Sequence, residues 1–234
     1  MALDFNSPTY PYPQVPSPNN DLKGAEKIPY LLLRYLLDLP DENGYTPRET
    51  NDYPRVRFAK YVWYDDAKPL DLPVPTPQQK LSMLFDSDHP DINTDEDKQK
   101  HPKGYRLLWQ KIRGQSILEA QTLVKCYIGR VFSPRPYHTT IGVRFEIGTD
   151  VNFETNTRTD DYSRAFNIEQ CIRESLARVN MTGVGAISFQ RSDHPDNGSM
   201  FIWDEGTIVG RTLHCSIDWV DADAPDVDGM CESC

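Results

Sequence analysis

The chain has 234 residues, of which 38% are hydrophobic and 19 are proline, so we expect one domain with elaborations, a modest core and much loop or extended arm. Its formal net charge is -10 and its Lys and Arg residues are scattered singly, which argues against specific nucleic-acid binding. The most apolar run, residues 28–39, is shorter than the roughly 20 residues of a membrane span, and residues 1–16 lack the pattern of a signal peptide.

The first 21 residues are rich in proline, with Tyr10 and Tyr12 between the prolines. Proline fixes φ and pushes its predecessor to extended geometry, so the sequence predicts an extended, polyproline-like arm. Such an arm either lies along a neighbouring subunit, with the two tyrosines as contacts, or is a disordered tail.

The next region, residues 22–103, is predicted to contain helices and loops. Its Leu-rich run at 28–39 favours a helix that Pro40 ends. Residues 55–64 begin with apolar and charged residues in alternation, which predicts a strand. The other expected elements are a proline-rich linker at 68–77, a short helix at 78–85 and an exposed polar loop at 86–101.

From residue 104 the patterns predict a short helix followed by a hairpin. Residues 104–113 carry an apolar stripe at helical spacing. The stripe consists of Tyr105, Leu108, Trp109 and Ile112. Residues 122–131 and 140–147 both alternate, with a turn at 133–138 between them, and so predict an antiparallel hairpin with one buried face.

A polar loop at 150–160 leads to the clearest helix, at 161–180, with an N-cap from residues 159–161. Charged residues of this helix, including Arg164 and Glu169, are expected to face outward. Strands are predicted at 184–190 and 207–219, and Arg211 interrupts the apolar face of the second.

Together these elements predict an α+β fold class: a small, mainly antiparallel sheet with flanking helices, plus an extended Pro-rich N-terminal arm and long loops. The expected segments are the arm at 1–21, a helical and loop region at 22–103, an α+β domain at 104–220 and an acidic flexible tail at 221–234.

The order of elements over about residues 121–220 resembles the tail terminator, or tail-completion, family of tailed bacteriophages. The resemblance covers the C-terminal half only. The stretches that carry it are QTLVKCYIGRV, TTIGVRFEIGTD, RAFNIEQCIRESLARVN, GVGAISFQ and GRTLHCSIDWV. In that family a helix precedes the first strand, a place that residues 107–112 or the 28–39 helix could fill.

The resemblance implies a virion structural protein that has no catalytic role and no cofactor. Its subunits would form a homo-oligomeric ring, usually a hexamer, at the head–tail junction. Its partners would be further copies of itself, the tail tube protein and a head-completion or connector protein, while DNA passes without specific binding. Another neck, baseplate or minor tail protein is the alternative, because residues 1–103 exceed the usual size of the family.

Subunit contacts are expected from the arm and from arginines that flank the hairpin. The arginines could form salt bridges to acidic surfaces of neighbouring subunits, or they are solvated surface charges of little energetic weight. The candidate interface residues are Tyr10, Tyr12, Arg130, Arg135, Arg144 and Arg158.

Patterns that could carry metal or catalytic chemistry are weak. The sequence SDHPD occurs at 87–91 and 192–196 and could serve a metal-dependent enzyme, but its residue types are those of turns. Cys231 and Cys234 form one C-x-x-C pair, whereas a structural zinc site uses four ligands. We therefore expect no catalytic residues and no metal site. The other cysteines, Cys126, Cys171 and Cys215, are predicted to be small hydrophobic core residues.

Overall fold

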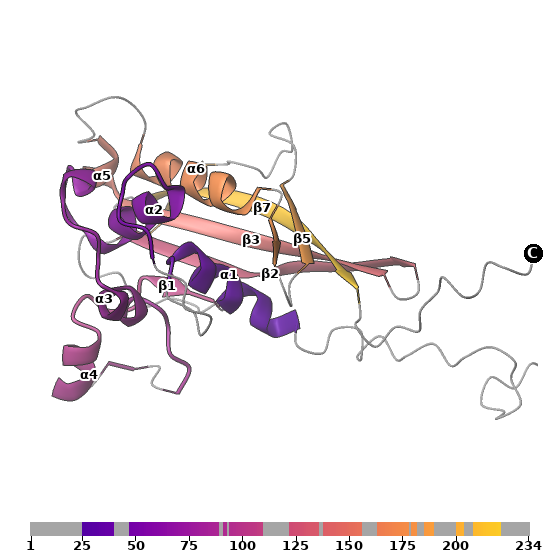
Figure 1. Cartoon of the computed structure of the whole chain (residues 1–234), viewed down its shortest axis with the longest axis horizontal. Helices are drawn as coiled ribbons and strands as arrows, with labels where there is room; N and C mark the ends of the chain where they lie inside the picture. Colours follow the sequence, from indigo (N-terminus) through magenta and orange to yellow (C-terminus); the bar gives the residue numbers. More distant parts are fainter. Residues whose placement is uncertain are drawn as a thin grey trace, which may run out of the picture.

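The computed structural model describes residues 25–39, 47–88, 91–92, 94–109, 122–135, 138–155, 163–177, 179–181, 185–189, 200–203 and 208–220. A long, twisted sheet carries helices on one face (Figure 1), which is the predicted α+β fold class. The apolar residues of α1, α2 and α6 share one buried cluster with those of the central strands, so these helices cover that face.

The sheet has seven strands in the order β1-β2-β3-β7-β5-β4, and β6 pairs with β7 beside this path. Its centre consists of three long antiparallel strands: β2 (Thr122–Arg135), β3 (His138–Asp150) and β7 (Ile208–Val220). The short strands are β1 (Leu107–Leu108), β4 (Asn180–Met181), β5 (Gly185–Phe189) and β6 (Met200–Trp203). The predicted hairpin and the strands expected at 184–190 and 207–219 are confirmed.

Alternation of side chains along the long strands directs one face of each toward the helices. Cys126, Phe145 and Leu213 are neighbours across β2, β3 and β7, and each is 0% exposed. A slip of one residue in any of these strands would turn its apolar residues to the other face, so burial of this face fixes the register.

Two predicted helices are present. α6 (Arg164–Leu176) is the predicted long helix, shorter at both ends. Its N-cap is Ser163, whose hydroxyl accepts a hydrogen bond of 3.2 Å from the backbone N–H of Phe166, and not one of the residues 159–161. α1 (Ile28–Leu36) follows the short turn η1 (Ala25–Lys27) and has proline in its first turn, where no amide hydrogen is needed.

The strand predicted at 55–64 is wrong, because this segment is the helix α2 (Pro54–Trp63). Proline again occupies the first turn. Phe58 and Val62 are one helical turn apart and both are 0% exposed, with α2 packed against α6 and β2. The alternation extends over only four residues, and from Ala59 onward the buried residues follow helical spacing.

The helix predicted at 104–113 is also wrong over residues 104–109, whereas residues 110–113 lie outside the described segments. The backbone N–H groups of Arg106 and Leu107 both donate to Met83 O at 2.9 Å, and Val124 donates to Arg106 O at 2.8 Å. These long-range hydrogen bonds hold the segment extended beside β2. Leu107 and Leu108 are both buried, but in two different apolar clusters, as expected for adjacent residues of an extended segment.

Short helices also interrupt two stretches expected to be loops. α4 (Asp95–Lys100) begins with a capping box between Thr94 and Asp97, and α5 (Val151–Thr155) follows β3 directly. The linker contains the turn η2 (Pro69–Asp71), and α3 (Pro77–Ser82) confirms the short helix expected at 78–85. The two-residue β4 and the four-residue β6 were not predicted.

The three core cysteines are free and buried, as predicted. Burial raises the pKa of Cys171 and Cys215 to about 12, so both thiols stay protonated at neutral pH.

Candidate functional site

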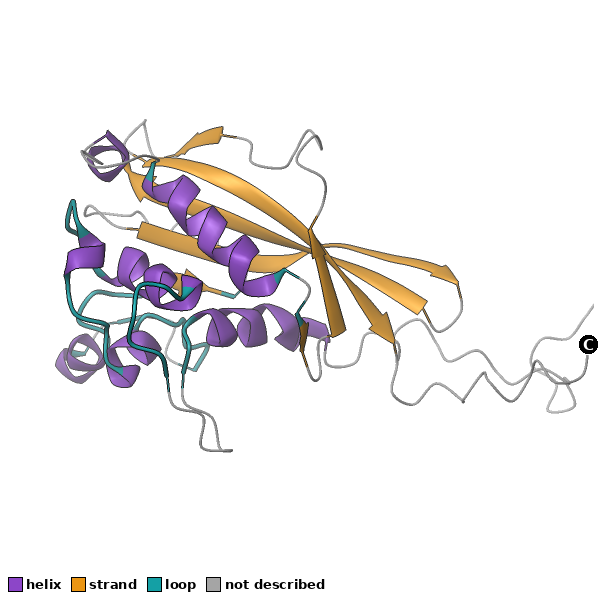
Figure 2. Ribbon diagram, turned by 45° about the horizontal axis from the view of Figure 1, so that its top comes forward, coloured by secondary structure: helices purple, strands orange, loops and turns teal. Residues whose placement is uncertain are grey.

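The ends of β2, β3 and β7 extend beyond the layer of helices (Figures 1 and 2). Arg135, His138 and Val220 are paired across these three ends, so the strands finish level. We call this part of the sheet the projecting end. Val131 of β2 lies toward it and is 40% exposed, which makes it one of three exposed large apolar residues in the described part of the chain.

The face of the long strands that points away from the helices is polar. Cross-strand rows on this polar face join Lys125 to Glu146 and Tyr127 to Arg144. The hydroxyl of Tyr127 donates to the Glu146 carboxylate, and Arg144 Nε lies 3.5 Å from Glu146 Oε1. Burial, followed by this hydrogen bond, raises the pKa of Tyr127, so its hydroxyl remains a donor over the physiological range.

A register shift at Gly129 keeps Arg130 on the polar face. Ile128 pairs with Val143 and Arg130 pairs with Gly142, so β2 has one more residue than β3 at this point. A Cβ on Gly142 would lie 3.3 Å from Arg130 O, so the close approach of the two strands here favours glycine. Because of the bulge, Lys125, Tyr127 and Arg130 share one face.

Two of the six predicted interface residues, Arg130 and Arg144, therefore lie on the polar face, with Arg130 exposed. Arg135 ends β2 at the projecting end, and its side chain is not described. The remaining candidates, Tyr10, Tyr12 and Arg158, lie outside the described residues.

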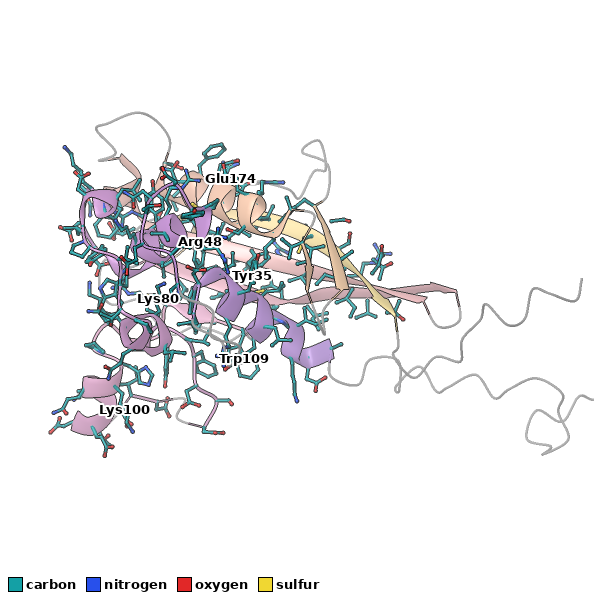
Figure 3. All side chains as sticks on the ribbon, viewed as in Figure 1. Tyr35, Arg48, Lys80, Lys100, Trp109 and Glu174 are labelled. Carbon is teal, nitrogen blue, oxygen red and sulfur yellow. The ribbon has the colours of Figure 1, made fainter. Side chains whose placement is uncertain are left out.

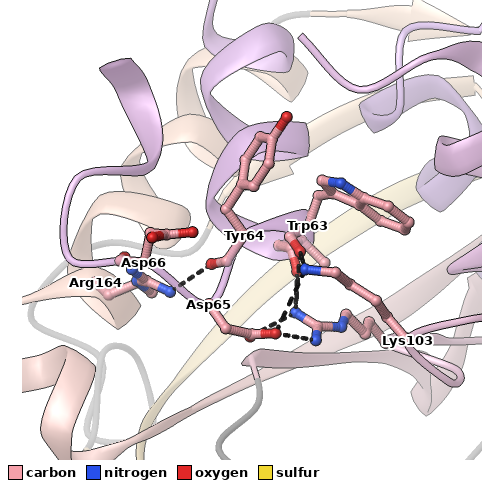
Figure 4. Close-up of polar contacts among 8 residues, drawn as sticks. Trp63, Tyr64, Asp65, Asp66, Lys103 and Arg164 are labelled. Carbon is pink, nitrogen blue, oxygen red and sulfur yellow. Dashed lines mark hydrogen bonds and ion pairs between the residues drawn. The ribbon is translucent and has the colours of Figure 1, made fainter. Parts of the chain in front are cut away.

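A second polar cluster surrounds the C-terminal end of α2 (Figure 4). The last carbonyl groups of a helix have no partner within the helix and carry partial negative charge. Arg106 Nη1 donates to Val62 O at 2.8 Å, and Lys103 Nζ donates to Trp63 O at 2.9 Å. Arg164 of α6 donates to Tyr64 O at 2.9 Å and also to Asp66 O. Three cations from outside α2 thus cap its end.

Arg106 and Asp65 form the strongest ion pair of this cluster. Arg106 Nη1 and Nη2 lie 2.8 and 2.6 Å from the two carboxylate oxygens, which is a bidentate arrangement. The side chain of Arg106 is 2% exposed, and that of Asp65 is 31% exposed. No sequence pattern pointed to this pair, because its members are 41 residues apart.

The C-terminal end of α1 is also held by cations. Asp38 follows the helix with a φ of 51°, and its carboxylate lies 2.9 Å from Arg55 and accepts from the Arg48 backbone N–H at 2.8 Å. Lys80, labelled with Tyr35 and Arg48 in Figure 3, donates to Asp38 O at 3.2 Å from a buried position. The buried carboxylate and carbonyl of Asp38 are therefore compensated by Arg55 of α2 and Lys80 of α3.

Lys80 allows a test by pH. Burial lowers the pKa of Lys80, Asp38 opposes this effect and Arg55 adds to it. Between the folded pKa and 10.5 the unfolded chain binds more protons at this residue, so its contribution to stability rises with pH. We expect Lys80→Met to lose this rise in urea unfolding at a series of pH values, whereas the exposed Lys98→Met should retain it. An unchanged pH profile in Lys80→Met would contradict the assignment.

Glu169 and Arg164 were expected to face outward, and both expectations are wrong. Glu169 is 3% exposed and accepts hydrogen bonds from Arg173 at 2.9 Å and from Arg211 of β7 at 2.6 Å. Arg164 is 1% exposed because it caps α2. Arg211, which interrupts the apolar face of β7, is thus the partner of a buried carboxylate.

The described residues offer little that could perform catalysis. Among them there is no group of three or more His, Cys, Asp or Glu residues that could hold a metal ion. Ser87 and Asp88 of the first SDHPD sequence lie at the surface, and the second sequence lies outside the described residues, as do Cys231 and Cys234. None of the described helices has the length and apolar composition needed to cross a membrane.

No protein-family model matches the chain, and no curated protein or solved structure matches it. The polar face and the projecting end of the sheet are therefore the features of the molecule that bear on its function.

Proposed function

We propose that this protein is a self-assembling structural protein of a tailed-phage virion. Its subunits would form a hexameric ring at the head–tail junction. The observation that carries the proposal is the projecting end, where three long strands leave the helical layer together (Figure 2). Strand edges and faces of this kind are a common means of joining identical subunits. The order of elements in residues 121–220 supports the tail terminator role in particular.

The buried charges are consistent with this proposal. Arg106, Arg164 and Lys80 all contact helix ends, and Glu169 joins α6 to β7. These contacts fix the helices on the sheet and account for the buried ion pairs without a substrate. The net charge of -10 would let DNA pass through a ring without strong attachment.

Val131 gives a test of the proposed ring. We expect native mass spectrometry and negative-stain imaging of the purified protein to reveal a closed ring, and Val131→Asp to shift it toward monomers by about tenfold, because a charge would be desolvated at the contact. The matched control is Leu81→Asp, at a similarly exposed apolar residue on α3 (46% exposed), which should leave the ring intact. A protein that stays monomeric at all concentrations and is absent from virions would end the proposal.

Another neck, baseplate or minor tail role is the second candidate. It is favoured by the N-terminal region, since α1 and α2 contribute to the same core as the sheet and enlarge the fold beyond the terminator-like part. Immunogold labelling of virions separates the two roles: a single ring between portal and tail tube supports the terminator, and any other position supports the alternative.

A further inference from the structure

The outer edge of β2 is long and only partly covered. β1 pairs with this edge at Val124 and Lys125, and no other strand in the described residues pairs with it. The N–H group of Val124 points outward, since it donates to Arg106 O. The two-residue period of a strand directs the N–H groups of Cys126 and Ile128 to the same side. Such an edge can accept an added strand.

This edge is basic. β2 contains Lys125, Arg130 and Arg135 and has no Asp or Glu. The bulge at Gly129 places Lys125 and Arg130 on the same polar face, where Arg144 of β3 lies in the neighbouring strand. Glu146 of β3 faces Lys125, so this part of the face has three cations and one carboxylate, and a complementary added strand would be acidic.

Residues 221–234 have the complementary composition. They contain Asp221, Asp223, Asp226, Asp228 and Glu232 and have no Lys, Arg or His. Asp221 and Asp223 are two residues apart, as are Asp226 and Asp228, so each pair would share a face in an extended chain. This segment directly follows β7, which ends level with β2 at the projecting end.

We propose that residues 221–234 of one copy add as a strand to the outer edge of β2 in a second copy. Backbone hydrogen bonds beyond the part of the edge that β1 covers would supply affinity, and the pairing of aspartates with Arg130 would set register. Each subunit would then offer both a donor segment and an acceptor edge, which is a head-to-tail contact that can close into a ring. The inference rests on the proposed function, because it names the contact that joins the copies.

The test is a charge exchange in the full chain, followed by sedimentation velocity over a range of concentrations. We expect Arg130→Glu alone, and Asp223→Arg with Asp226→Arg alone, each to weaken self-association by at least about tenfold. Combining the three substitutions should restore self-association to within about threefold of wild type, because opposite charges then face each other again. Lys98→Glu on α4 is the matched control for the first variant, since Lys98 is 64% exposed and far from β2 in sequence.

The outcomes separate the two proposals. The strand addition would be overturned, and the ring left in place, if neither Arg130→Glu nor the double aspartate variant weakened the oligomer. The same conclusion would follow if the triple variant failed to restore it. Protection of the β2 edge from hydrogen exchange that depends on residues 221–234 but not on protein concentration would place the segment on its own chain, which also overturns it. Monomers at every concentration would overturn both proposals.

Discussion

Replacing Asp65 by alanine is expected to lower the free energy of unfolding by about 3 kcal/mol. Removing one member of a buried ion pair costs roughly 3–5 kcal/mol, because the other charge remains buried without compensation. Arg106 is the buried member, at 2% exposure, whereas Asp65 is partly exposed, so the low end of the range applies. Urea unfolding followed by circular dichroism would measure the change.

The neighbouring residue provides the control. The side chain of Asp66 is exposed, and only its backbone carbonyl takes part in the cluster, as acceptor for Arg164. Asp66→Ala should therefore change the free energy of unfolding by no more than about 0.5 kcal/mol. If Asp65→Ala lowers the free energy of unfolding no more than Asp66→Ala does, the helix-end carbonyl groups alone compensate the charge of Arg106.

The elements that could be predicted from sequence are those with long, regular burial on one side. β3 and β7 are each 13 residues long, and their alternation is visible without any knowledge of their partners. The apolar residues of α6 recur just as regularly at helical spacing, and Ile168 and Ile172 among them face the sheet. The periodicity of such elements is a direct consequence of backbone geometry.

Prediction failed where tertiary contacts decide between two local solutions. The first four residues of 55–64 fit a strand as well as a helix, and burial against α6 and β2 selects the helix. Leu107 and Leu108 are extended because Met83 and Val124 supply hydrogen-bond partners from elsewhere in the chain. Neither partner is visible in the local pattern.

The candidate site was only partly predictable for the same reason. Arg130 and Arg144 could be placed near the hairpin, but the bulge that puts Arg130 on the polar face is known only from the pairing of β2 with β3. Arg164 and Glu169 were assigned to the surface because charged residues of an amphipathic helix usually face water. The one sequence signal for the burial of Glu169 is Arg211, a charge in an otherwise apolar strand face, and no such signal marks Arg164.

Glu169 is the second position at which a large effect is expected. Glu169→Ala should lower the free energy of unfolding by about 3 kcal/mol, because Arg173 and Arg211 then lose a buried carboxylate that both contact. Glu174→Ala, on the same helix with a side chain that is 48% exposed, should cost no more than about 1 kcal/mol.

A double substitution tests whether charge compensation is the cause. Glu169→Met with Arg211→Met replaces both partners by apolar groups of similar volume, which is often neutral for a buried ion pair. We expect this variant to recover most of the stability that Glu169→Ala loses, since Arg173 is 22% exposed and can turn its charge toward water. If the double variant unfolds as easily as Glu169→Ala, the ion pair itself contributes the stability, and an uncompensated charge left by Glu169→Ala is not the cause of the loss.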